Sequence, residues 1–226
     1  MLGRLDLSGE ERVLDAGCGS GRVTELLLER LPAGYVVALD ASEAMIGEAR
    51  RRLRGAGRRV GLVVADLAAQ PPLGRSVDAI LSTATFHWIR DHDALFRHLA
   101  SVLRPGGRLA AQCGGTGNIG RLRDAVLRLG VSWDDEAYFA GPRETRTRLE
   151  DAGFVDVVCW LQEEPTRVEP GERLETYLRT VCLRSLVEPM AGPQGDAFVR
   201  RAAEQLPDGE LDYVRLNIAA RRAGAP

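Results

Sequence analysis

The chain has 226 residues, 45 % of them hydrophobic, which is enough to bury the core of a single globular domain. Thirty basic and 32 acidic residues leave a formal charge of -2, which argues against nucleic acid or an anionic membrane as the partner and favours a small molecule. The four cysteines form no close pair, which excludes a metal knuckle or a dithiol redox site, so no metal is expected.

Short apolar segments alternate with amphipathic ones over the first half of the chain. The apolar segments, rich in Val, Leu and Ala, are typical of strands buried on both faces: 12–16, 35–40, 60–65, 77–83 and 108–113. Helical patterns separate them at 20–31, 42–54 and 93–103, and Ser42 is a plausible N-cap of the second helix. This alternation predicts a doubly wound α/β fold, in which ligands bind at the carboxyl ends of the parallel strands.

The second half of the chain departs from simple alternation. We predict a helix over 118–129, an irregular segment around 133–142, a helix ending at Ala152 and a strand over 154–161. The segment 211–219 has the period of a last strand. Between these strands, 167–207 holds two amphipathic helices whose apolar stripes contain Leu174, Leu178, Val181, Cys182 and Ser185 in the first, and Phe198, Val199, Ala202, Ala203 and Leu206 in the second. We therefore expect one domain, 1–226, with a core over 12–113 and insertions at 117–141 and 167–207 that form a helical cap over the substrate.

A glycine-rich turn follows the first strand. A dinucleotide fingerprint requires glycines at the first, third and sixth positions, which here hold Gly17, Gly19 and Arg22. The third glycine of this chain is Gly21, one position early, and a long cationic side chain stands where helix and strand should touch. This argues against NAD, although a tight turn without any ligand remains an alternative.

Three successive strands end near an acidic residue. Asp15, Asp40 and Asp66 would share one rim of a parallel sheet, where each alone could equally be a helix cap or a solvated carboxylate. Together they describe a pocket for a positively charged adenosine compound. In it, Asp40 would accept the ribose hydroxyls, Asp66 would meet the adenine amine, and Asp15 would lie near an ammonium group or organise the turn.

The motifs "VLDAGCGSG", "ALDASEAMI", "VVADL", "VDAILSTATFHWI" and "LRPGGRL" resemble, in order and spacing, those of class I S-adenosylmethionine-dependent methyltransferases. The stretch from Phe86 to Gly115, with helices between the last two strands, is similar to the trans-aconitate methyltransferase-like group of small-molecule enzymes. This resemblance implies a Rossmann-like, seven-stranded sheet whose last strand is antiparallel, with S-adenosyl-L-methionine over the glycine turn. Such families usually carry an N-terminal helical arm, and since only residues 1–11 precede the first strand, we expect a more open pocket, another covering segment or a missing N-terminal part.

The resemblance also implies roles for residues at matching positions. The glycine turn would approach the methionine part of the cofactor, Asp40 would hold the ribose, Ala41 and Met45 would flank the adenine, and Ser82 or Thr83 would offer backbone to the amino acid end. The cofactor-binding residues expected in this way are Asp15, Gly17, Cys18, Gly19, Gly21, Asp40, Ala41, Met45, Ala65, Asp66, Leu67, Ser82 and Thr83.

The substrate side offers fewer candidates. His87 follows the fourth strand at the rim, so it is a general base or a residue that hydrogen-bonds its loop. Trp88 walls the substrate pocket or belongs to the core, and Arg184 contacts an anionic substrate or is solvated. His92 and His98 lie six residues apart and roughly 120° from each other around a helix, so they are not a metal pair.

The sequence thus predicts a small-molecule methyltransferase, with O-methylation of a carboxylate as the expected reaction. The alternatives are methylation of a phenol or an amine, a non-catalytic protein that binds S-adenosylmethionine or S-adenosylhomocysteine, and an NAD-dependent reductase, which Arg22 disfavours. Charged residues at the amino terminus exclude a signal peptide and no apolar run is long enough to span a membrane, so we expect a cytoplasmic monomer or homodimer.

Overall fold

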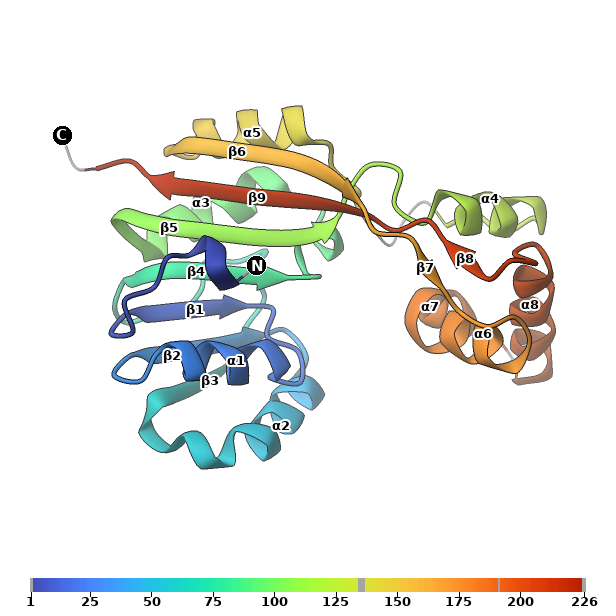
Figure 1. Cartoon of the computed structure of the whole chain (residues 1–226), viewed down its shortest axis with the longest axis horizontal. Helices are drawn as coiled ribbons and strands as arrows, with labels where there is room; N and C mark the ends of the chain where they lie inside the picture. The colour runs from blue at the N-terminus through green and yellow to red at the C-terminus, as the bar shows by residue number, and fades with distance from the viewer. Residues whose placement is uncertain (1, 134–136, 191, 225–226) are drawn as a thin grey trace.

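The computed structural model describes residues 2–133, 137–190 and 192–224, so residues 134–136 of the segment predicted to be irregular lie outside it. Its main sheet has seven strands, whose bounds are β1 (Arg12–Ala16), β2 (Tyr35–Asp40), β3 (Val60–Val64), β4 (Val77–Thr83), β5 (Leu103–Gly114), β6 (Phe154–Glu163) and β9 (Val214–Arg222). Their order is β3-β2-β1-β4-β5-β9-β6 (Figure 1). Strands β1 to β5 pair in parallel, and β9 runs antiparallel to both β5 and β6. The predicted fold class is confirmed.

Helices cover both faces of this sheet because alternate strand residues point to opposite sides. Val13 and Leu14 are neighbours in β1, yet Val13 packs with Leu27 and Leu31 in one core cluster, whereas Leu14 packs with residues of the other face in a second cluster. The helices that flank the sheet are α1 (Arg22–Arg30), α2 (Glu43–Arg52), α3 (His92–Val102) and α5 (Pro142–Asp151). Ser42 caps α2 as predicted, since its hydroxyl accepts the Met45 N–H.

Two strands begin at other residues than predicted. Strand β5 begins at Leu103 rather than 108, because Leu103 already pairs with Val77 of β4 before a shift in register. The last strand covers Val214–Arg222 instead of 211–219. Its expected beginning, Leu211, pairs instead with Thr166 in a separate two-stranded ribbon of β7 (Thr166–Arg167) and β8 (Glu210–Leu211).

The helical cap lies beyond the carboxyl ends of the parallel strands (Figure 1). It consists of α4 (Gly120–Arg128), α6 (Glu172–Tyr177), the π-helical turn η4 (Leu178–Cys182), α7 (Arg184–Val187) and α8 (Gly192–Glu204). These elements share one hydrophobic cluster, in which Leu122 and Val126 of α4 meet Leu174, Leu178 and Val199. The two insertions therefore pack on each other, although α5 and β6 lie between them in the chain.

The π-helical turn overturns one detail of the predicted stripe. Val181, expected on the buried face with Leu178 and Cys182, is 53 % exposed. A π turn carries more residues than an α turn, and the Leu183 N–H bonds back to the Leu178 carbonyl over five residues (2.7 Å). This extra residue rotates Val181 away from the cap's core. All five residues of the second stripe are buried or nearly so, as predicted.

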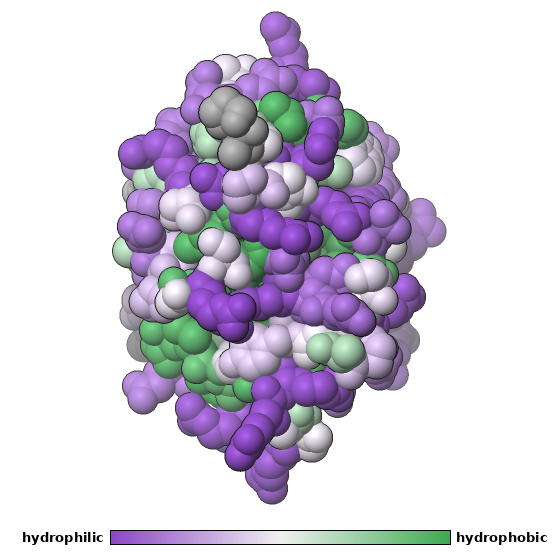
Figure 2. Space-filling model, turned by 90° about the vertical axis from the view of Figure 1, so that its left-hand side faces the viewer, coloured by the Kyte–Doolittle hydropathy of each residue, from purple (hydrophilic) through white to green (hydrophobic). Residues whose placement is uncertain are grey.

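The end of the molecule opposite the cap is mostly hydrophilic, with hydrophobic side chains in smaller groups among the charged ones (Figure 2). No helix in the described ranges combines the length and the apolar character needed to cross a membrane.

Candidate active site

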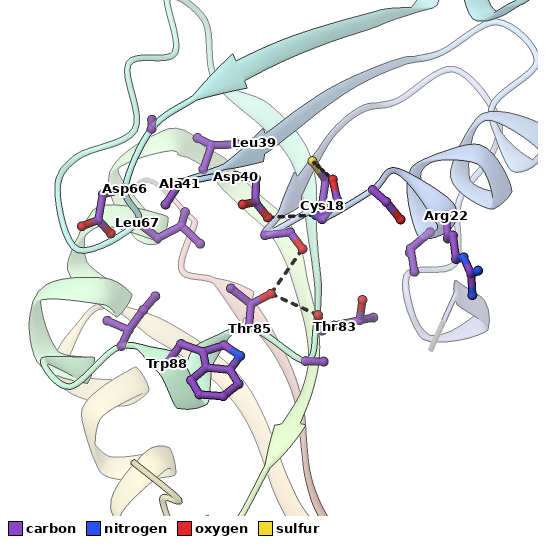
Figure 3. Close-up of a pocket in the computed structure, with 17 residues that line it drawn as sticks. Cys18, Arg22, Leu39, Asp40, Ala41, Asp66, Leu67, Thr83, Thr85 and Trp88 are labelled. Atoms are coloured by element: carbon purple, nitrogen blue, oxygen red, sulfur yellow. Dashed lines mark hydrogen bonds between the residues drawn. The ribbon is translucent and has the colours of Figure 1, made fainter. Parts of the chain in front are cut away.

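A cleft of about 650 Å³ opens at the carboxyl ends of β1, β2 and β4, a volume in the range of small-molecule sites (Figure 3). It lies where the strand order reverses, the position at which open α/β sheets bind ligands. Its lining consists of Gly17, Cys18, Gly19, Ser20, Arg22, Val23, Leu39, Asp40, Ala41, Ala65, Asp66, Leu67, Thr83, Ala84, Thr85, Trp88 and Ile89.

The turn after β1 forms the floor of the cleft. The N–H groups of Gly17 and Cys18 both donate to the Leu39 carbonyl, at 2.8 and 2.9 Å, which ties the turn to β2. Gly17 has φ +81°, and a Cβ there would stand 2.1 Å from Oγ1 of Thr85. The Thr85 hydroxyl lies 3.2 Å from the Gly17 carbonyl and 3.0 Å from that of Thr83. The turn and the loop after β4 are thus locked together at a distance that only glycine permits.

Asp40 connects the glycine turn to helix α2. Its Oδ2 accepts the Gly19 N–H at 2.8 Å (Figure 3). Its Oδ1 accepts the Ser42 N–H at 2.9 Å. A carboxylate oxygen has more than one acceptor position, so each oxygen can still take a hydroxyl hydrogen bond. The two backbone bonds hold the carboxylate in one orientation, and its place beside Ala41 suits the two hydroxyls of an adenosine ribose.

The other predicted acids differ in exposure. Asp66 is exposed at the far side of the cleft, where its Oδ1 accepts the Ala68 N–H at 2.8 Å (Figure 3). Asp15 is fully buried beneath the turn, where its Oδ2 accepts the Thr24 hydroxyl at 2.6 Å. Burial, with a smaller contribution from Asp40, raises the Asp15 pKa to about 6. Of the two roles considered for Asp15, the geometry supports organising the turn.

The Cys18 thiol lines the cleft and is protected from reaction by its surroundings. Burial raises its pKa to about 12, and the negative charges of Asp15 and Asp40 add to this effect. A thiol, unlike a thiolate, is a poor nucleophile. Cys18 can therefore lie beside an electrophilic ligand without consuming it.

Nine of the thirteen predicted cofactor residues line the cleft, and the structure does not bring Asp15, Gly21, Met45 and Ser82 to it. Gly21 is buried as the N-cap of α1, and the Ser82 hydroxyl donates to the Ala16 carbonyl at 2.7 Å between two strands. Both therefore support the turn from below. Met45 lies in the first turn of α2 without reaching the lining, which corrects its expected contact with the adenine.

The cleft also contains residues that the sequence analysis missed. Thr85 and Ile89 follow β4 by way of Ala84, which has φ +55° although it is not glycine. This left-handed conformation turns the chain into the cleft, and its N–H is satisfied by the Gln112 carbonyl at 2.7 Å. No sequence signal marks an alanine in this conformation. A glycine at position 17 of the sequence indicates that some other group approaches the turn closely, but it does not reveal that this group is the Thr85 side chain.

A second cavity, of about 250 Å³, adjoins the cleft and shares Ala84 and Trp88 with it. It lies between the sheet and the helical cap, and its lining consists of Ala84, His87, Trp88, Asn118, Ile119, Arg123, Trp133, Ala137, Phe139, Tyr177, Val181, Cys182, Tyr213 and Arg215. Trp88, which is 57 % exposed, thus stands where two ligands in the two cavities would meet. Val181 reaches this cavity because the π turn rotates it out of the cap's core.

His87 is nearly buried in the wall of the second cavity. Its Nδ1 accepts the Gly114 N–H at 3.3 Å, and its ring packs against Trp88 at 4.7 Å and Phe139 at 5.9 Å between centroids. Burial, followed by the positive charge of Arg215 and then His92, lowers the His87 pKa to about 4. The ring is therefore neutral at physiological pH.

The rest of the cavity's lining, from the cap and from the beginning of β9, carries hydroxyl and guanidinium groups. The hydroxyls of Tyr177 and Tyr213 lie 3.0 Å apart, and Cys182 Sγ is 3.4 Å from that of Tyr213. The Arg215 guanidinium lies over the Tyr213 ring at 4.3 Å, and that of Arg123 over Phe139 at 5.5 Å. Arg184, the predicted substrate residue of the cap, is 72 % exposed, lies 4.0 Å from Glu188 and lines neither cavity. Of its two expected roles, contact with an anionic substrate or solvation, the structure shows a solvated side chain on the short helix α7.

Comparison with known proteins identifies the class. Residues 13–107 match the family model described as a methyltransferase domain. Over almost the whole chain, the protein is 41 % identical to the trans-aconitate 2-methyltransferases of Acidovorax sp. (99 % of this chain and 91 % of the relative) and of Escherichia coli K12 (98 % and 90 %). Among solved structures, the Bacillus subtilis YcgJ protein has a TM-score of 0.68 at 16 % identity over 100 % of this chain and 97 % of the other. The phosphoethanolamine N-methyltransferase 2 of Haemonchus contortus has a TM-score of 0.65 at 20 % identity, over 98 % of this chain and 51 % of the other.

The chain therefore belongs to the class I S-adenosylmethionine-dependent methyltransferases, and within them it is homologous to the trans-aconitate 2-methyltransferases. S-Adenosyl-L-methionine is its methyl donor, and its acceptor is a small molecule. This membership removes the NAD-dependent reductase and the non-catalytic binding protein from the alternatives. The cleft's lining suits such a donor, because it combines the backbone of a glycine turn, the Asp40 carboxylate held by two backbone N–H groups, and the Cys18 thiol with its raised pKa.

Proposed function

We propose that the protein transfers the methyl group to a carboxylate oxygen of a small polycarboxylate bound in the second cavity. The relatives named above are trans-aconitate 2-methyltransferases, and trans-aconitate is an unsaturated tricarboxylate. The proposed cofactor residues are those predicted from the sequence that line the cleft: Gly17, Cys18, Gly19, Asp40, Ala41, Ala65, Asp66, Leu67 and Thr83.

The charge of the second cavity is the observation that carries this proposal. Within the described residues, its lining contains two arginines, Arg123 and Arg215, and no Asp or Glu. Both guanidinium groups are partly buried, where ion pairs with a ligand are less screened by solvent. Arginine binds carboxylates in two-pronged fashion, so a pair of arginines suits a ligand with two or more carboxylates.

The proposed reaction also suits the few ionisable groups of the site. A carboxylate is already ionised at neutral pH, so it needs no general base, whereas a phenol or an ammonium must first lose a proton. The donor supplies a methyl carbon made electrophilic by sulfonium. The acceptor oxygen forms a bond to that carbon as the carbon–sulfur bond breaks, and the electron pair of that bond stays on sulfur. The protein's part is to align the two ligands and exclude water, with Trp88 and Ala84 at their junction.

An acceptor panel with a pair of arginine variants tests this function. Methyl transfer is measured with trans-aconitate, other di- and tricarboxylates, monocarboxylates, phenols and amines. Arg123→Gln should raise KM for polycarboxylates about 10- to 100-fold, since a hydrogen-bonded charge is lost. Arg128→Gln is the matched control, because this exposed residue of the same helix, paired with Gln205, does not line the cavity. Turnover of phenols or amines alone, or equal effects of the two variants, would contradict the proposal.

A further inference from the structure

The proton of His87 can be assigned to one ring nitrogen from the structure. A backbone N–H can only donate, so the Nδ1 atom that receives the Gly114 N–H at 3.3 Å must carry a lone pair. In a neutral imidazole with Nδ1 as acceptor, the proton is on Nε2. An imidazolium would point a second N–H at the Gly114 donor, so this environment opposes protonation of the ring.

The ring is held in this orientation from several sides. Trp88 and Phe139 flank it, and Phe139 can come this close because residue 114 is glycine: a Cβ there would stand 2.7 Å from the Phe139 ring. The His87 carbonyl accepts the Tyr138 N–H at 2.8 Å, which fixes the backbone as well. The side chain is 8 % exposed. A half-turn of the ring would put a carbon, Cδ2, in the place of Nδ1 and so would break the bond to Gly114.

The remaining nitrogen, Nε2, belongs to a ring that lines the second cavity. No hydrogen-bond partner of Nε2 is found in the described part of the chain, and Nε2 is not among its fully buried, unpartnered atoms. Among the described residues, the titratable and charged groups around the ring are Arg215 on β9, Arg123 on α4, His92 on α3, Cys113 on β5, and Tyr177, Cys182 and Tyr213 across the cavity. Glu164 does not line the cavity but pairs with Arg215, 3.7 Å from its Nε. The cationic ones discourage a proton on Nδ1, and no described carboxylate lines the cavity to encourage it.

We propose that His87 binds the methyl acceptor as a hydrogen-bond donor through its Nε2–H, orienting the acceptor carboxylate through the oxygen that is not methylated, and that it does not act as a general base. This role rests on the proposed function, because a carboxylate has a second oxygen to be held in this way. It makes three donors around the cavity complementary to one anion: His87 after β4, Arg123 on the cap helix α4 and Arg215 on β9. Methyl transfer then requires no proton to leave the acceptor.

The first test needs no substrate and so is independent of the proposed function. Long-range ¹H–¹⁵N spectra of the full chain, with His87 assigned through His87→Gln, should show the Nε2–H tautomer unchanged between about pH 5.5 and 8. A Nδ1–H tautomer, or an imidazolium appearing in this range, overturns the assignment.

The second test separates a donor from a base in turnover. A glutamine amide nitrogen reaches the position of Nε2 and donates, so His87→Gln should keep kcat/KM for the carboxylate acceptor within about tenfold, whereas His87→Leu should lose about 10- to 100-fold, mainly in KM. The affinity for S-adenosylmethionine should be the same in both variants, because His87 does not line the cleft. If His87 were a general base, both variants would be equally inactive, and the rate of the wild type would fall as the pH is lowered. This result would overturn the donor role. If no carboxylate is methylated at all, the proposed function is contradicted. The tautomer measurement still decides the protonation of His87, because it needs no substrate.

Discussion

The side chain of Thr85 fills the space that a side chain at position 17 would require. An ideal Cβ on Gly17 would lie 2.1 Å from Thr85 Oγ1 and 2.6 Å from its Cβ, far inside van der Waals contact. The glycine turn that lines the cleft is therefore fixed by a contact between the loops after β1 and β4, and not only by the conformational freedom of glycine.

Gly17→Ala should accordingly remove most of the affinity for S-adenosylmethionine. The added methyl group must displace the turn or the loop after β4, and both line the cleft. Gly19→Ala is the matched control: its φ of +53° is also positive, but nothing lies within 4 Å of the added Cβ, so it should cost only about 1 kcal/mol of backbone strain. Isothermal titration calorimetry measures both affinities. Equal losses in the two variants would show that strain, rather than the contact with Thr85, matters.

Asp40→Ala should weaken S-adenosylmethionine binding by about 2 to 3 kcal/mol, because two hydroxyl hydrogen bonds to a charged acceptor disappear. Some of this loss comes from the Gly19 and Ser42 N–H groups, which lose their common acceptor. Asp66→Ala should cost less, since this carboxylate is exposed and can reach only the edge of the ligand. Calorimetry that finds unchanged affinity for Asp40→Ala would remove Asp40 from the ribose site.

The buried carboxyl of Asp15 should make stability depend on pH. In the folded chain its pKa is raised, mainly by burial, from 3.8 to about 6, so the folded state binds a proton that the unfolded state has released between about pH 4 and 6. The free energy of unfolding should therefore fall as pH rises through this range, by about 3 kcal/mol from this group at most, and the loss should persist above pH 6.

Asp15→Asn, which can still accept the Thr24 hydroxyl, should remove that component. Urea unfolding of both proteins at pH 4.5 and 7.5 checks it, because the change in the variant relative to the wild type cancels the pH dependence of all other groups. The same pH dependence in both proteins would mean that Asp15 has an ordinary pKa in the folded state.

The helical cap should matter for the acceptor and not for the donor. All residues that line the cleft lie between Gly17 and Ile89, outside the cap. Leu178→Ala, which truncates a fully buried side chain of the cap's cluster, should destabilise the cap by about 2 to 5 kcal/mol and lower turnover while leaving S-adenosylmethionine affinity intact. Val181→Ala should hardly change stability but should alter KM, because Val181 is exposed to the second cavity. Loss of donor binding in a folded Leu178→Ala protein would assign the cap to the cofactor site instead.

Much of the fold could be predicted from the sequence because buried parallel strands are continuous apolar runs. The five segments of the first half appear as strands at nearly their expected positions. The bounds of the last strand could not be predicted, because alternation continues from Leu211 to Ala219 whether Leu211 pairs with Thr166 or within the main sheet. In the same way, a stripe at helical spacing does not reveal that a π turn moves Val181 to the surface.

For the site, spacing placed the glycine turn and Asp40 correctly but could not separate residues that line the cleft from those beneath it. Asp15 and Ser82 lie at the ends of strands that do line it, and their side chains bond inward to Thr24 and Ala16. The second cavity brings together residues from η3 (Phe86–Trp88), α4, η4 and β9, which are far apart in the chain. No local sequence pattern indicates that these elements meet, so Arg123 and Arg215 could be recognised as cavity residues only in the structure.

The bond formed by the reaction tests the central claim most directly. The protein is incubated with S-adenosylmethionine carrying a ¹³C-labelled methyl group and with trans-aconitate, and the product is followed by ¹³C NMR before and after mild alkaline hydrolysis. The account predicts a methyl ester signal that alkali converts to methanol, formed at an undiminished rate between about pH 6 and 8. Other acceptors then replace trans-aconitate in the same experiment. The account would be contradicted if the labelled methyl group appeared on nitrogen, carbon or a phenolic oxygen and no carboxylate gave a methyl ester.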